Sequence, residues 1–377
     1  NGSIYIIKEG EKTLELNNKN GLTGGNVIKI FEDKEGTIWF LSPQKGVSQL
    51  LHKKMKLFDK YDLYFNGIDN IVKENDSSYY FVSRNNGIIK HCSSSGSFDT
   101  LKVPDSFESD PHIKYYSAIF SPTRSLLMVG TNNGLLTFKN DALNSFHSLT
   151  VKPYETFKIY DLAEGKSGII WLATSHGIYF VKDDGIQKLN DKLNINIDMV
   201  SCVTLGKNGT IYFGTNLGLI AWNNQKLVNL SQTTGLKTGQ IRQIKTFNDS
   251  SYWIASDKGL FKCINNELMH YELPGYEKNI IHSFEFDLNK NLWIGLSDGL
   301  IRVTELDSTK KIRFFSKESG FLGGGCNSNS MVVSKDNQLF VGTDEGLLVV
   351  NAADTFESKS TYFPFLDISV LGPENID

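Results

Sequence analysis

The stretch Asn291-Leu292-Trp293-Ile294-Gly295-Leu296-Ser297-Asp298-Gly299-Leu300 decides the fold, because its pattern returns along the whole chain. The pattern is a short apolar run with an aromatic residue near its centre, a small residue, two or three polar residues, and a glycine followed by an aliphatic residue. Its eight marker glycines are Gly46, Gly87, Gly134, Gly177, Gly218, Gly259, Gly299 and Gly346, separated by 41, 47, 43, 41, 41, 40 and 47 residues. Such a period, without helical 3.6-residue periodicity, predicts an all-β propeller of four-stranded antiparallel blades.

Each copy of the pattern can be divided into four short strands. The first, such as residues 27–31, is closed by a polar turn such as 33–36. The second carries the aromatic residue and is apolar on both faces, so it has to be covered on both sides, as a blade between two other blades is. The third begins at the marker glycine, as in 177–181, because a residue without Cβ tolerates the positive φ of a tight connection. The fourth, such as 226–230, is amphipathic and is expected to lie outermost.

The tryptophans support this division into strands. Burying one such side chain between blades contributes roughly 4–6 kcal/mol as an upper bound. We therefore expect a packing role for the four tryptophans in the aromatic position, which are Trp39, Trp171, Trp253 and Trp293.

The composition excludes several classes of protein. The 377 residues are 40% hydrophobic and 21% charged, which is typical of a globular protein. The 39 Lys and Arg residues are balanced by 42 Asp and Glu residues, so no nucleic-acid-binding groove is indicated. The four cysteines are scattered singly, which argues against a zinc or redox motif and favours small buried side chains. No cofactor and no metal site is predicted. The N-terminus lacks the features of a signal peptide, and we expect the chain to be an internal fragment.

The closure of the ring leaves two alternatives. After the third strand of the last copy, at 347–350, no fourth strand follows at the right distance, so an earlier strand is expected to complete that blade. If residues 12–16 do so, the ring has eight blades. If residues 56–61 do so, it has seven, and the residues before about 55 precede it.

Two stretches carry a resemblance to a known family. The run 30–39 (IFEDKEGTIW) and the final copy, 319–327 followed by 339–347 (LFVGTDEGL), resemble the regulator-propeller repeat of hybrid two-component system sensors. The resemblance covers roughly residues 20 to 351. It implies seven blades in residues 56–355, a remnant of a preceding propeller or a first blade in residues 1–55, and the start of a truncated immunoglobulin-like domain or a linker in residues 356–377.

The resemblance also implies a function and partners. Family members are periplasmic sensors of polysaccharide-degrading bacteria, so we expect an oligosaccharide ligand, signal transfer to a transmembrane histidine kinase, and a homodimer in the parent sensor. Contact with a membrane would come only through C-terminal segments that this chain lacks.

In a propeller, the loops from second to third strand and from fourth to first strand emerge on one face around the central channel. Their amides, charges and aromatic rings suit a sugar, whose hydroxyls need donors and acceptors and whose ring faces stack. We predict no catalytic residue. The predicted ligand-binding residues are Arg84, His112, Tyr154, His176, Arg242, Tyr276 and His282, with Tyr115 nearby.

Three other classes stay open. A glycosidase of the sialidase type would need an arginine cluster, but the arginines here are widely separated. A streptogramin-lyase-like enzyme would use histidine and metal chemistry, for which His112, His176 and His282 are the candidates, although no metal-binding histidine spacing supports it. A protein-interaction scaffold would need an exposed apolar patch. The sequence favours binding over catalysis.

Overall fold

The computed structural model describes residues 4–8, 11–16, 26–32, 38–43, 46–50, 55–59, 66–103, 113–149, 157–182, 185–189, 197–206, 208–223, 226–234, 237–247, 251–264, 267–304, 306, 310–317 and 321–353. The chain divides into two compact units. One comprises residues 54–353, and the other contains the described residues before 54.

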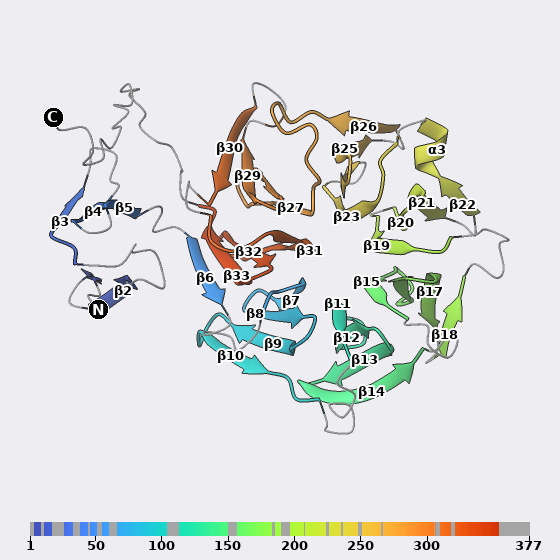
Figure 1. Cartoon of the computed structure of the whole chain (residues 1–377). Coiled ribbons are helices and arrows are strands. Elements are labelled where there is room, and N and C mark those ends of the chain that lie inside the picture. The colour runs from blue at the N-terminus through green and yellow to red at the C-terminus, as the bar shows by residue number, and fades with distance from the viewer. Residues whose placement is uncertain are drawn as a thin grey trace. The chain divides into compact units, whose positions relative to one another are not determined.

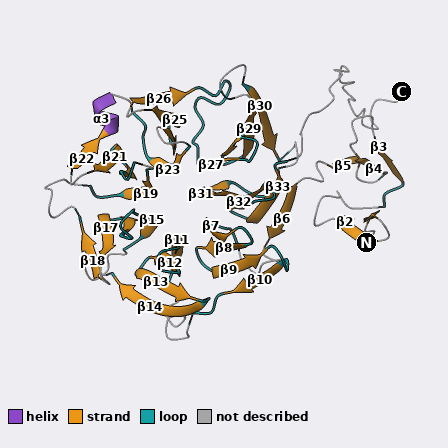
Figure 2. Ribbon diagram, turned by 180° about the vertical axis from the view of Figure 1, so that it is seen from behind, coloured by secondary structure: helices purple, strands orange, loops and turns teal. Residues whose placement is uncertain are grey.

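Residues 54–353 form a β-propeller in which seven four-stranded antiparallel sheets surround a common axis, as Figures 1 and 2 show from opposite sides. The predicted fold, including its seven blades, is confirmed. The innermost strands are β7 (Asn70–Asn75), β11 (Tyr115–Ser121), β15 (Ile159–Glu164), β19 (Val200–Leu205), β23 (Ile241–Thr246), β27 (Ser283–Phe286) and β31 (Cys326–Val333).

The outer three strands of each blade follow in order from the axis. The second strands are β8 (Ser78–Ser83), β12 (Leu126–Thr131), β16 (Ile170–Thr174), β20 (Ile211–Thr215), β24 (Ser251–Ser256), β28 (Leu292–Gly295) and β32 (Gln338–Thr343). The third strands are β9 (Gly87–Cys92), β13 (Gly134–Lys139), β17 (Gly177–Lys182), β21 (Gly218–Asn223), β25 (Gly259–Ile264), β29 (Gly299–Thr304) and β33 (Gly346–Asn351). The fourth strands are β10 (Ser97–Thr100), β14 (Ala142–Ser148), β18 (Gly185–Lys188), β22 (Lys226–Asn229), β26 (Glu267–Tyr271), β30 (Lys311–Ser316) and β6 (Met55–Asp59).

The last blade is closed by a strand from the other end of the propeller. Strand β6 pairs antiparallel with β33, with Phe58 opposite Leu347 and Met55 opposite Val350. Of the two alternatives for closure, the strand predicted at 56–61 is therefore the one used, and it begins one residue earlier, at Met55. Because β6 covers the edge of β33, the pairing also hides the backbone groups that an open edge would expose.

A repeated hydroxyl explains why a Ser or Thr precedes the marker glycine. In the third blade, the Thr174 hydroxyl donates to the carbonyl oxygen of Gly177 at 2.7 Å and accepts from the backbone N–H of His176 at 3.1 Å. Thr131, Thr215, Ser256 and Thr343 make the same pair of bonds. Gly177 has a φ of 103°, a conformation open to glycine, so hydroxyl and glycine together define the turn.

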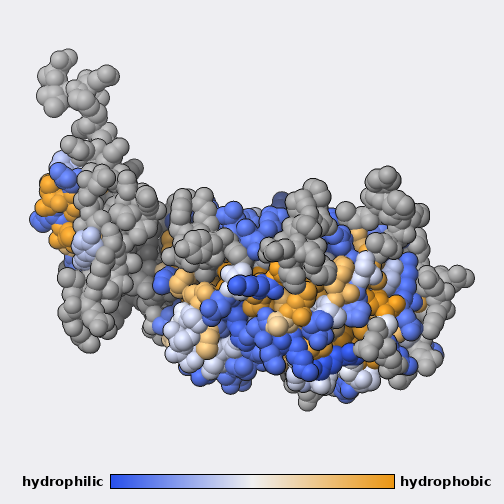
Figure 3. All heavy atoms as spheres, turned by 90° about the horizontal axis from the view of Figure 1, so that it is seen from below, coloured by the Kyte–Doolittle hydropathy of each residue, from blue (hydrophilic) through white to orange (hydrophobic). Residues whose placement is uncertain are grey.

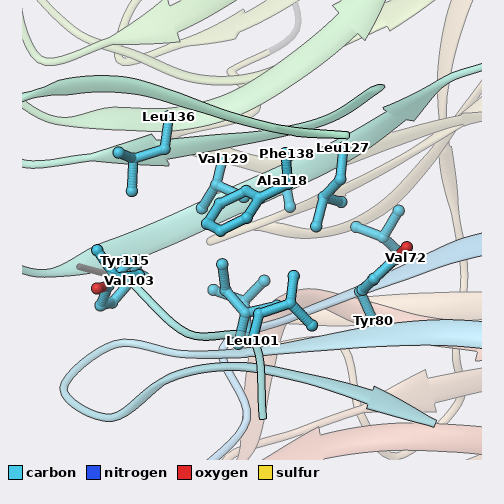
Figure 4. Close-up of a cluster of buried hydrophobic side chains, with 12 residues drawn as sticks. Val72, Tyr80, Leu101, Val103, Tyr115, Ala118, Leu127, Val129, Leu136 and Phe138 are labelled. Carbon is cyan, nitrogen blue, oxygen red and sulfur yellow. The ribbon is translucent and has the colours of Figure 1, made fainter. Parts of the chain in front are cut away.

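The hydrophobic core is divided among the interfaces between neighbouring blades. The cluster in Figure 4 joins Val72 and Tyr80 of the first blade to Ala118, Leu127 and Phe138 of the second. Similar clusters join the second to the third blade, the third to the fourth, the fourth to the fifth, the fifth to the sixth, and the seventh to the first. Three of the tryptophans expected to pack there are buried, namely Trp171, Trp253 and Trp293.

The described residues before 54 form two small antiparallel sheets. Strands β1 (Ile4–Lys8) and β2 (Glu11–Leu16) make one, and β3 (Lys29–Glu32), β4 (Ile38–Ser42) and β5 (Gly46–Leu50) make the other. Trp39 on β4 is half-buried and stacks on Phe31 with ring centroids 6.2 Å apart. The first copy of the repeat is therefore not one of the seven blades. Its assignment to a preceding propeller stays a prediction, and residues 354–377, including the predicted start of an immunoglobulin-like domain, lie outside the described residues.

Two local predictions need correction. The fourth strand expected at 226–230 ends at Asn229, and Leu230 begins a short helix, α3 (Leu230–Thr234). Cys202, Cys263 and Cys326 are buried as expected, but Cys92 is half-exposed because it lies at the end of β9.

The surface seen in Figure 3 mixes hydrophilic residues with hydrophobic patches. None of the described helices has the length and hydropathy of a membrane span.

Candidate ligand site in the central channel

A cavity of about 670 Å³ lies where the inner strands begin, and all seven blades contribute residues to its lining. The second-to-third strand turns add Arg84, Ser297 and Asp344. The cavity is therefore on the propeller face where the sequence places the candidate loops.

A β-bulge that recurs in four consecutive blades directs side chains into this cavity. In the second blade, Tyr115 pairs with Thr131 and Ser117 with Gly130, which leaves Tyr116 as the extra residue. The same shift of register occurs at Tyr160, Ser201 and Arg242. All four bulged residues line the cavity. A bulge re-aims a side chain in this way without ending the strand.

The residues two positions before each bulge line the cavity as well. They are Lys114, Lys158, Met199 and Gln240. Side chains two residues apart in an extended segment lie on the same side, so each of these blades directs a pair of residues into the cavity. Two of the pairs combine a lysine with a tyrosine.

In the seventh blade, the pairing between the first and second strands is interrupted over a longer stretch. Cys326 pairs with Thr343 and Met331 with Val341, and Asn327, Ser328 and Asn329 between them line the cavity. Two amides fix this segment to the first blade. The side-chain nitrogen of Asn327 donates to the carbonyl oxygen of Ile68 at 2.8 Å, and that of Asn70 donates to the carbonyl oxygen of Asn329 at 3.3 Å.

On one side of the cavity, Arg84 and Asp69 form an ion pair. Nη2 of Arg84 lies 2.6 Å from Oδ1 of Asp69, and the backbone N–H of Arg84 donates to Oδ2 at 2.8 Å. Burial raises the pKa of the Asp69 carboxyl, and Asp344 adds to the rise, while Arg84 opposes it. A bound polar group would compete with Arg84 for this carboxylate.

On the fifth and sixth blades, Arg242 and His282 form a second polar group. Nε of Arg242 lies 2.8 Å from Oδ1 of Asp257, and Nη1 donates to the Ser328 hydroxyl at 3.4 Å. Burial lowers the pKa of the His282 imidazole, and the Arg242 charge lowers it further. Both effects favour the neutral ring, which offers one donor and one acceptor.

Two tyrosines supply the aromatic surface. The rings of Tyr116 and Tyr160 meet edge to face with centroids 5.9 Å apart. The Arg84 guanidinium lies 5.3 Å and the Lys158 ammonium 5.9 Å from the centroid of the Tyr116 ring. The cavity thus combines ring faces with donors and acceptors, which is the chemistry that suits a sugar.

The structure brings three of the predicted site residues together, namely Arg84, Arg242 and His282. It does not bring His176 or Tyr276 to the cavity. The His176 ring stacks on Phe157 with centroids 5.5 Å apart, and Tyr276 packs against Phe314 at 5.6 Å. His112 and Tyr154 lie outside the described residues.

Several lining residues were not predicted from the sequence, among them Asp69, Lys114, Tyr116, Lys158 and Tyr160. Tyr115 was predicted near the site, but it is buried between the first two blades, and its neighbour Tyr116 lines the cavity. The bulge explains the error, because one extra residue exchanges the two faces of the strand. The recurrence of a lysine and a tyrosine two residues apart at 114 and 116 and again at 158 and 160 was the available signal.

The described residues contain no group of three or more His, Cys, Asp or Glu side chains that could hold a metal ion. Of the three histidines considered for lyase chemistry, only His282 has been placed at the cavity. The prediction that no metal is bound stays a prediction.

Comparison with known proteins gives the fold but no family. No protein-family model matches the sequence. No curated protein matches it either. Among solved structures, the extracellular domain of a hybrid two-component system from B. thetaiotaomicron is similar, with a TM-score of 0.69 and 16% identity over 89% of this chain and 46% of that chain. This chain therefore spans less than half of that structure.

Two enzymes with the same fold are also similar to this chain. Streptogramin B lyase gives a TM-score of 0.63 at 18% identity, with 79% of this chain and 97% of that chain covered. A catalytically inactive virginiamycin B lyase from Staphylococcus aureus, solved with quinupristin, gives 0.62 at 14% identity, with 78% of this chain and 98% of that chain covered. At such identities the likeness concerns the fold alone.

Proposed function

We propose that this chain is the ligand-sensing propeller of a periplasmic two-component sensor. In this proposal it binds an oligosaccharide in the central cavity and passes the event to a transmembrane histidine kinase. The observation that carries the proposal is the convergence of paired polar and aromatic side chains from neighbouring blades on one cavity of about 670 Å³. The similarity to the extracellular domain of a hybrid two-component system supports the sensor part.

The geometry of the cavity favours an extended polar ligand. Its lining includes charged pairs, amides, hydroxyls and the edge-to-face tyrosines Tyr116 and Tyr160. A saccharide buries ring faces against aromatic side chains while its hydroxyls exchange water for donors and acceptors on the wall. Because most of these groups lie on the inner strands or at the residue directly before them, the site needs little ordering on binding.

Calorimetric titration of the chain with plant and host glycan fragments tests the proposal. We expect one fragment to bind, and we expect Tyr116→Ala to weaken its binding about tenfold or more, since a buried aromatic contact contributes about 1.4 kcal/mol or more. Tyr276→Ala is the matched control, because Tyr276 packs outside the cavity. Silence of the chain and of the full-length sensor towards every fragment would reject the proposal.

A lyase activity is the second candidate, and His282 is the observation that favours it. Its imidazole lines the cavity, and its lowered pKa favours the neutral ring, which is the form that can accept a proton. Incubation with a streptogramin substrate, followed by mass spectrometry, separates the two functions. Turnover that is lost in His282→Ala would favour the enzyme.

A further inference from the structure

Charge is distributed unevenly around the cavity. Four cationic side chains, Arg84, Lys114, Lys158 and Arg242, line it, against the two carboxylates Asp69 and Asp344. Each arginine is already paired, Arg84 with Asp69 and Arg242 with Asp257. Neither lysine forms an ion pair within the part of the chain that the structure describes.

The backbone holds both lysines in the same way. The N–H of Lys114 donates to the Asn132 side-chain oxygen at 2.7 Å, and the N–H of Asn132 returns a bond to the Lys114 carbonyl at 3.0 Å. Lys158 makes the equivalent pair with the hydroxyl and N–H of Ser175, at 3.0 and 2.9 Å. The two ammonium groups are therefore presented by neighbouring blades at equivalent positions.

We infer that the cavity binds an anionic ligand, whose carboxylate or sulfate group lies against Lys114 and Lys158 while an attached sugar ring contacts Tyr116. The carbohydrate part of this inference rests on the proposed function, whereas the anionic part rests on the charges alone. Lys158 is half-buried beside the Tyr116 ring. In such a partly desolvated place an opposite charge is attracted more strongly than in water, so an acidic sugar is distinguished from its neutral counterpart.

Two pairs of acidic and neutral sugars, together with one anion that contains no sugar, separate the anionic part of the inference from the carbohydrate part. Calorimetry of the chain at low salt compares tetragalacturonate with neutral galactotetraose, galactose 6-sulfate with neutral galactose, and citrate as a polyanion without sugar. We expect an acidic member of a pair to bind at least tenfold more tightly than the neutral member. We expect each of Lys114→Gln and Lys158→Gln to weaken that binding about tenfold.

Two control variants test whether weaker binding comes from loss of the two cavity charges or from a change in the net charge of the protein. Lys139→Gln removes an exposed lysine at the end of β13, outside the cavity, and is expected to change nothing. Lys114→Arg combined with Lys158→Arg keeps the charges and should retain binding. Thermal unfolding of every variant checks that the propeller is intact.

The outcomes distinguish the two proposals. Binding of citrate without any sugar, lost in the lysine variants, supports the anionic site and argues against an oligosaccharide ligand. Equal binding of neutral and acidic sugars, unaffected by the lysine variants, overturns the anionic site and leaves the sensor proposal standing. If no anionic probe binds at low salt, the inference is wrong.

Discussion

Asp161 in the third blade accepts a hydrogen bond from the backbone N–H of Val203 in the fourth blade, with 3.0 Å between Oδ2 and N. Its other oxygen accepts the N–H of Leu162 at 2.9 Å. The same place is taken by Asn70 in the first blade, bonded to the N–H of Ala118, and by Gln243 in the fifth, bonded to the N–H of Phe284. These side chains join neighbouring inner strands around the channel, where blades have no shared ladder.

Because Asp161 is buried, the contribution of this contact to the free energy of unfolding depends on pH. Desolvation raises the pKa of the Asp161 carboxyl from its ordinary value of 3.8 to about 7, although the two backbone bonds and Lys245 oppose the rise. Unfolding therefore releases a proton between these pH values, so this group lowers the free energy of unfolding as pH rises from about 4 to about 7, by at most about 4 kcal/mol. Denaturation of the wild type and of Asp161→Asn across this range measures the effect.

The asparagine variant should lose this slope. Its free energy of unfolding should also be lower by about 1–3 kcal/mol at every pH, because its amide cannot accept both backbone bonds. Asp198→Asn, at an exposed position, serves as control and should keep the slope. An unchanged slope in Asp161→Asn would contradict the assignment.

The turn hydroxyls give a second prediction. Thr174→Val keeps the shape of the side chain but removes the donor to Gly177 and the acceptor for His176. Because Thr174 and its bond to Gly177 are buried, we expect the free energy of unfolding to fall by about 1–3 kcal/mol in urea denaturation. Thr174→Ser should recover most of it, and a valine variant as stable as the wild type would disprove the role of the hydroxyl.

Two buried tryptophans should respond differently to Phe. Nε1 of Trp293 donates to Oδ2 of Asp287 at 3.0 Å, whereas Nε1 of Trp253 has no hydrogen-bond partner in the described structure. Trp293→Phe loses a bond to a charged group, while Trp253→Phe removes an unsatisfied donor. We expect the first to cost about 1–2 kcal/mol more than the second, measured by chemical denaturation. The reverse order would be inconsistent with the described geometry.

Closure by β6 can be tested with two shortened chains. A chain beginning at residue 54 retains β6, and one beginning at 62 leaves β33 as an exposed edge. Losing even one buried side chain such as Met55 costs roughly 2–5 kcal/mol, so the shorter chain should be destabilised by about 3 kcal/mol or more and should self-associate. Denaturation and size-exclusion chromatography compare the two, and equal behaviour would exclude closure by β6.

The bulge predicts opposite roles for adjacent tyrosines. Tyr115 is 6% exposed within the core between the first two blades, so Tyr115→Ala should cost about 3–5 kcal/mol of unfolding free energy. Tyr116 lines the cavity, so Tyr116→Ala should cost less than half as much and affect ligand binding instead. If thermal and chemical denaturation rank the two variants the other way, the strand is not bulged at this point.

The sequence by itself determined the architecture. A blade is formed by about 40 consecutive residues. The contacts of its aromatic second strand, its turn hydroxyl and its marker glycine are made by residues close together in the sequence. Trp293 could therefore be assigned a structural role from its neighbours in the chain. The closing strand remained one of two alternatives, because β6 and β33 are at opposite ends of the propeller sequence.

Only the tertiary structure decided which side chains face the channel. Alternation along a strand specifies two faces, and a single extra residue exchanges them, so Tyr116 instead of Tyr115 reaches the cavity. The same holds for His176, whose loop lies on the predicted face but whose ring packs on Phe157. Strand pairing between distant residues fixes these orientations, and the local pattern of polar and apolar residues carries no information about them.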